Sequence, residues 1–97
     1  MSTFLNASAL GATEVIAAKT ERSIRVVSLA MATTLANQVK FLSASTDISA
    51  TWPLGANGGI VLPYNDHGWM ETAAGEALNV NLGVATATGI HIEYIVV

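Results

Sequence analysis

The stretch LNVNL at residues 78–82 alternates apolar and polar side chains, and IHIEYIVV at residues 90–97 begins in the same way. A period of two is typical of a strand with one buried and one solvated face. The apolar residues expected to face inward are Leu78, Val80, Leu82, Val84, Ile90, Ile92, Tyr94 and Val96. His91 and Glu93 are expected to face outward. The intervening ATATG at residues 85–89 is typical of a turn, so the two stretches are predicted to pair as an antiparallel hairpin.

The same alternation continues in the N-terminal half of the chain. Residues 23–26 and 27–31 both alternate, and the parity changes between Val26 and Val27, which predicts a β-bulge there. A helix within residues 13–42 is the open alternative, because this segment is rich in alanine and Glu21 and Arg25 are spaced four apart. Short strands are expected near residues 14–19, 23–33, 37–43, 47–52, 59–62, 68–72, 76–84 and 90–97.

A chain of 97 residues corresponds to one domain. Many short strands separated by turns predict an all-β fold, a sandwich or a barrel, over residues 13–97. Residues 1–12 contain Asn6, Ser8 and Gly11 and are expected to form an N-terminal arm outside the core.

Charged residues make up only 11% of the chain, against about 25% in ordinary globular proteins. Much of the surface must therefore carry small polar residues or be covered by another protein. Four basic residues against seven acidic ones argue against nucleic acid as a partner. The absence of cysteine excludes a disulfide framework, and no apolar run reaches the ~20 residues of a membrane span. The first residues lack the basic-then-apolar pattern of a signal peptide.

Asp66 and His67 are the strongest catalytic candidates, because a carboxylate can orient a histidine for general-base chemistry. No serine lies in a Gly-x-Ser-x-Gly context, and the run from Asn65 to Gly68 is typical of a turn. A metal site drawn from Asp66, His67, Glu71 and His91 lacks the spacing of known ligand sets. The carboxylates of Glu71 and Glu76 lack the cleft a glycosidase needs, and Glu76 is expected to hydrogen-bond the turn before the next strand. We therefore expect no catalytic residue, no metal and no cofactor.

Aromatic residues flank the polar turn in the middle of the chain. If exposed together, they could stack on a sugar ring or anchor a protein interface. Packing in the core is the alternative for Trp52 and Trp69. The candidate contact residues are Trp52, Tyr64, Asn65, Asp66, His67 and Trp69.

Residues 39–47, the glycine-rich stretch at 56–59 and above all ETAAGEALN at residues 71–79 resemble a group of small phage and prophage proteins of this length. The resemblance implies a virion structural protein with a compact antiparallel, jelly-roll-like β-sandwich of about eight short strands. It implies a non-enzymatic capsid decoration (cement) protein that self-associates, as a trimer by analogy, and binds the major capsid protein or another virion protein. Such a protein is made in the bacterial cytoplasm and resides in the virion. The alternative is a carbohydrate-binding or tail-associated host-attachment module, with a glycan as partner.

Overall fold

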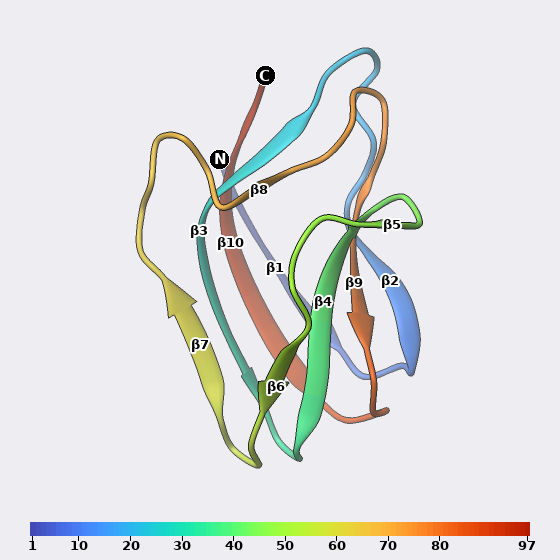
Figure 1. Cartoon of the computed structure of the whole chain (residues 1–97), viewed down its shortest axis with the longest axis vertical. Helices are drawn as coiled ribbons and strands as arrows, with labels where there is room; N and C mark the ends of the chain where they lie inside the picture. Colours follow the sequence, from blue (N-terminus) through green and yellow to red (C-terminus); the bar gives the residue numbers. More distant parts are fainter.

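The computed structural model describes residues 1–97 and is all-β, with no helix (Figure 1). The segment 13–42, for which a helix was the alternative, consists of strands and their connections. The predicted strand at 47–52 is divided into two short strands at its ends. The ten strands are β1 (Ser2–Ala7), β2 (Gly11–Ile16), β3 (Ile24–Thr33), β4 (Asn37–Ser43), β5 (Thr46–Asp47), β6 (Trp52–Leu54), β7 (Gly59–Leu62), β8 (Met70–Glu71), β9 (Leu78–Leu82) and β10 (Thr88–Val96).

The strands form two antiparallel five-stranded sheets. Sheet A has the order β1-β10-β3-β7, with β8 also paired to β3. Sheet B has the order β2-β9-β4-β5, with β6 also paired to β4. The pairs β1–β10, β2–β9, β3–β7 and β4–β6 are nested, so the chain is one long hairpin folded over on itself with its tip at residues 44–51. This is the arrangement of a jelly-roll sandwich.

The hairpin predicted between the last two long strands is wrong. β9 lies between β2 and β4 in sheet B, whereas β10 lies between β1 and β3 in sheet A. The inward faces were predicted correctly up to Leu82 and from Ile90 to Ile92, but Val84 is exposed in the connection. Tyr94 and Val96 are only half-buried. Alternation identifies the buried face of a strand, and two strands facing each other across a core show the same alternation as two neighbours.

The N-terminal arm predicted for residues 1–12 does not match the structure either. β1 pairs with β10 over its whole length, and β2 pairs with β9. Gly11 begins β2 with a positive φ of 91°, where a side chain would be strained. Ala7 is buried in the core, so this segment belongs to the sandwich.

The predicted β-bulge in β3 is confirmed. Val26 pairs with Tyr94 and Ser28 pairs with Glu93, so Val27 is the extra residue opposite β10. Both valines are buried. On its other side β3 pairs with β7 beyond the bulge and with β8 before it. The bulge therefore lies where the chain between β7 and β8 leaves sheet A.

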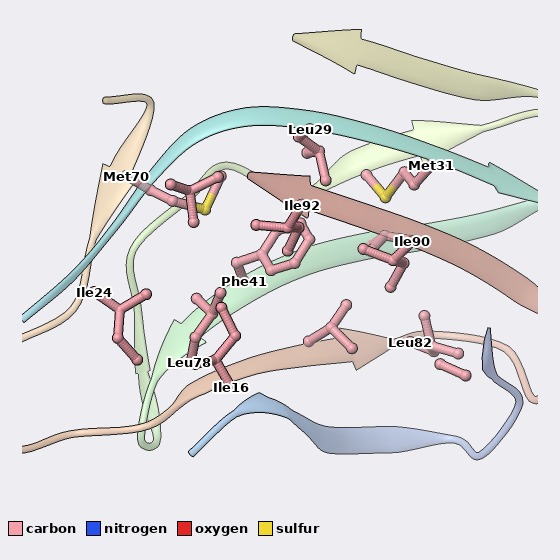
Figure 2. Packing of buried hydrophobic residues seen from close by; sticks show 14 residues of the cluster. Ile16, Ile24, Leu29, Met31, Phe41, Met70, Leu78, Leu82, Ile90 and Ile92 are labelled. Carbon is pink, nitrogen blue, oxygen red and sulfur yellow. The ribbon is translucent and has the colours of Figure 1, made fainter. Parts of the chain in front are cut away.

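The core lies between the two sheets (Figure 2). Phe41 of β4 is the largest fully buried side chain, and Figure 2 shows its ring in the middle of the cluster, beside Ile92 of β10. Trp52 of β6 packs edge-on against it, with ring centroids 6.1 Å apart. The buried cluster consists of Ala7, Ile16, Ile24, Val26, Leu29, Met31, Val39, Phe41, Met70, Leu78, Val80, Leu82, Ile90 and Ile92.

Candidate contact surface

The polar stretch predicted as a contact loop connects β7 to β8 and is attached to the bulge of β3. The backbone N–H of Asn65 donates to the carbonyl of Val27 at 2.9 Å, and that of Trp69 donates to the carbonyl of Val26 at 2.8 Å. The reversal of the apolar–polar alternation between Val26 and Val27 therefore coincides with both the bulge and the attachment of the loop. Loops held this way on a rigid sheet are common positions for binding residues.

Inside the loop, local hydrogen bonds form a tight turn. The Asn65 side-chain oxygen accepts from the backbone N–H of His67 at 3.0 Å, and the Asn65 carbonyl accepts from that of Gly68 at 2.9 Å. Gly68 has a φ of 81°, and a Cβ there would lie 2.4 Å from Cγ of Arg25. Asp66 and His67 are both exposed. The turn residues hold the backbone, which agrees with the structural interpretation of this run.

The loop presents two aromatic rings to solvent. Trp69 donates its indole N–H to the carbonyl of Pro63 at 2.7 Å, and 43% of the residue is exposed. Tyr64 is 62% exposed. Trp52, predicted to join them, lies in sheet B and packs half-buried on Phe41. The structure thus brings together residues 64–67 and Trp69, and leaves Trp52 in a structural position.

Asp66 interacts with Tyr64. The Asp66 carboxylate, as a hydrogen-bond acceptor for the phenol and through its negative charge, raises the pKa of Tyr64 above its ordinary value of 10.0, with smaller contributions from desolvation and from Glu93. Both carboxylates disfavour the phenolate.

We expect Asp66→Ala to lower the pKa of Tyr64 toward 10.0, because the substitution removes both the acceptor and the charge. Ultraviolet titration of the phenolate band measures the shift, with Tyr64→Phe identifying the signal. An unchanged titration in Asp66→Ala would contradict this contact.

The motif at residues 71–79, which carries the family resemblance, ties the β8–β9 connection to both sheets. Glu71 and Arg25 face each other across β8 and β3 and form an ion pair at 2.8 Å. Thr72 is buried and bonds Ile24 twice: its hydroxyl accepts from the Ile24 N–H, and its own N–H donates to the Ile24 carbonyl, both at 2.9 Å. These contacts fix the motif to β3.

The second half of the motif is fixed to β4. The buried Ser43 hydroxyl donates to the Glu76 carboxylate at 2.5 Å and accepts from the N–H of Ala73 at 2.9 Å. Asn79 donates from its side chain to the carbonyl of Ala44 at 2.8 Å. The sequence predicted that Glu76 hydrogen-bonds the turn before the next strand. Its partner is instead Ser43, which lies 33 residues earlier, and nothing in the sequence around Glu76 indicates this contact. The polar residues of the motif therefore have structural partners.

Ser43→Ala should destabilise the fold by about 1–3 kcal/mol, because the part-buried N–H of Ala73 and the Glu76 carboxylate each lose a partner. Ser45→Ala is the matched control, since Ser45 is exposed two residues further along and should change stability little. Urea unfolding of both variants measures the difference. Equal midpoints would contradict the role assigned to Ser43.

No group of three or more His, Cys, Asp or Glu side chains converges in a way that could hold a metal ion. Among the residues considered for a metal, Glu71 is paired with Arg25, and His91 lies on the outer face of sheet A with its ring 6.2 Å from that of Phe4. The chain has no helix long and apolar enough to cross a membrane.

The outer face of sheet A carries a groove, lined mainly by apolar residues, that was not predicted from the sequence. One row of side chains crosses this sheet from Phe4 of β1 through His91 and Ala30 to Val61 of β7. Phe4 and Val61 are 71% and 72% exposed. They flank a floor of small residues at Ala30, Ala32 and Gly89. We call this surface the outer groove; it lies between the two larger apolar side chains, over the small residues of β3 and β10, and His91 also lines it.

Comparison of the chain with protein-family models, with curated proteins and with solved structures finds no match.

Proposed function

We propose that the chain is a non-enzymatic virion structural protein of a bacteriophage, a capsid decoration protein that self-associates and binds the head shell. The outer groove is the observation that carries the proposal: Phe4 and Val61, each more than 70% exposed, stand on one face of a charge-poor sandwich. Exposed apolar side chains on one face of a domain suit a protein–protein contact. The motif at residues 71–79 supports the choice of a phage partner by resemblance.

In this role the protein contributes contact area across neighbouring capsid subunits. The sandwich is rigid, because its two sheets share one packed core. A rigid module bound at several points gains affinity from multivalency although each contact is weak. The low charge suits this arrangement, because burying few charged groups keeps the desolvation penalty small.

Co-sedimentation with capsid shells tests the proposal. The purified protein is mixed with shells assembled from the major capsid protein encoded nearest to its gene, and the bound fraction is measured. Val61→Lys should reduce binding at least about tenfold, since it places a charge in the outer groove. The control is Ser45→Lys, an exposed position outside the groove. Absence of binding by the unaltered protein would overturn the proposal.

The exposed aromatics of the β7–β8 loop favour a second candidate, a carbohydrate-binding or host-attachment module. Tyr64 and Trp69 are solvent-exposed beside the polar side chains of Asp66 and His67, the combination that sugar stacking requires. A glycan array distinguishes the two functions. Binding that is lost in Trp69→Ala and retained in Val61→Lys would favour the module over the decoration protein.

A further inference from the structure

β1 is an edge strand of sheet A, and hydrogen bonds at its start show which backbone groups are free. The Met1 amino group donates to the Tyr94 carbonyl at 3.0 Å, and the Tyr94 N–H donates to the Met1 carbonyl at 2.8 Å. In an antiparallel ladder such doubly bonded pairs recur at every second residue. The N–H and C=O groups of the alternate residues, Ser2, Phe4 and Asn6, therefore point away from β10. All three residues are exposed.

This edge lacks the features that usually prevent strands from pairing with other chains. Proteins protect edges with charges, prolines, bulges or short strands. β1 is six residues long, has no charged residue or proline, and pairs with β10 in unbroken register. The other edges are protected: β2 contains Glu14 and a register shift, and β7 has four residues and is followed by Pro63. β6 contains Pro53, and β5 and β8 have only two residues each.

We propose that β1 pairs antiparallel with β1 of a second copy of this chain, which joins the two A sheets into one continuous sheet. The free groups are spaced symmetrically about Phe4. A two-fold axis at this residue places Phe4 opposite the partner's Phe4, and Ser2 opposite the partner's Asn6. Each of these residues then exchanges backbone hydrogen bonds with its opposite, and the two exposed phenylalanine rings form a cross-strand aromatic pair.

The charges permit this pairing. The chain as a whole carries −3, yet its first charged side chain is Glu14, so no charged side chain lies on either strand of the pair. The terminal ammonium is held by the Tyr94 carbonyl. Pairing of like strands is isologous and closes as a dimer, in place of the trimer expected by analogy. Pairing β1 with β7 of the next copy is the heterologous alternative, which the short β7 and Pro63 disfavour.

The test is sedimentation analysis of the full-length protein over a range of micromolar concentrations. The unaltered chain should be a dimer, and Phe4→Lys should raise the dissociation constant at least about tenfold, because two lysines would then face each other. The Phe4 side chain is largely exposed, so the circular dichroism spectrum should not change. Val61→Lys is the matched control, since Val61 is equally exposed on the same face but at the opposite edge, and it should remain a dimer.

A backbone variant separates strand pairing from face contact. Asn6→Pro removes an N–H that points away from β10, so the sandwich should fold while the dimer weakens. A monomer, a trimer, or a dimer weakened equally by Val61→Lys would overturn the pairing. The biological role of this dimer rests on the proposed function, but the dimer itself is measured without capsid shells. A dimer that binds no shell would therefore support the pairing and overturn the proposed function.

Discussion

Val80→Asp should abolish folding. Val80 lies at the centre of β9, fully buried, with Thr13 of β2 on one side and Phe41 of β4 on the other. A carboxylate here would enter a core made of apolar side chains, with no basic group to pair with it. Burying an unpaired charge costs several kcal/mol, which is comparable with the 5–15 kcal/mol that stabilises a whole domain. Circular dichroism should show no cooperative thermal transition.

Val61→Asp is the control for this experiment. It makes the same substitution in another strand, at a position that is largely exposed. It should unfold within a few degrees of the unaltered protein. A folded Val80→Asp protein with a cooperative transition would contradict the placement of β9 in the core.

Phe41→Ala should reduce the free energy of unfolding by about 3–5 kcal/mol. Phe41 is the largest fully buried side chain and the partner of Trp52, so its removal leaves a cavity and deprives the indole of its edge-on contact. For a domain of this size each kcal/mol corresponds to about 4–8 °C in Tm, so the transition should fall by more than about 10 °C.

Calorimetry of Phe41→Ala beside Tyr64→Ala tests this expectation. Both variants remove an aromatic ring, but Tyr64 is mostly exposed and its loss should move Tm by only a few degrees. Similar losses in the two variants would show that Phe41 does not hold the two sheets together.

The sequence predicted strand faces well and strand partners poorly. Alternation placed Leu78, Val80 and Ile92 inward, as the structure has them, because burial on one face imposes a period of two. The bulge at Val27 was also visible, since an extra residue reverses the alternation. The partner of a strand has no such signature: the outer pairs of the nested hairpin, β1–β10 and β2–β9, join residues far apart in the chain, and a local hairpin was predicted instead.

The sequence predicted only those parts of the candidate site whose residues are close together in the chain. The turn at residues 65–68 follows from its residue types, and the loop around it carries the two exposed aromatics. Trp52 was placed there by sequence proximity, although β6 takes it to the other sheet. The outer groove combines residues from four strands, and Phe4 belonged to a segment interpreted as an arm. A surface assembled by strand pairing becomes visible only when the pairing is known.

The central position of β10 has a consequence for how the protein is made. β10 lies between β1 and β3 in sheet A, yet it is synthesised after both of them. At about 5–20 residues per second, β1 and β3 wait several seconds for the strand that joins them. Sheet A can therefore be completed only after residues 88–96 have been synthesised, and a chain stopped before residue 88 would leave β1 without its partner in the fold.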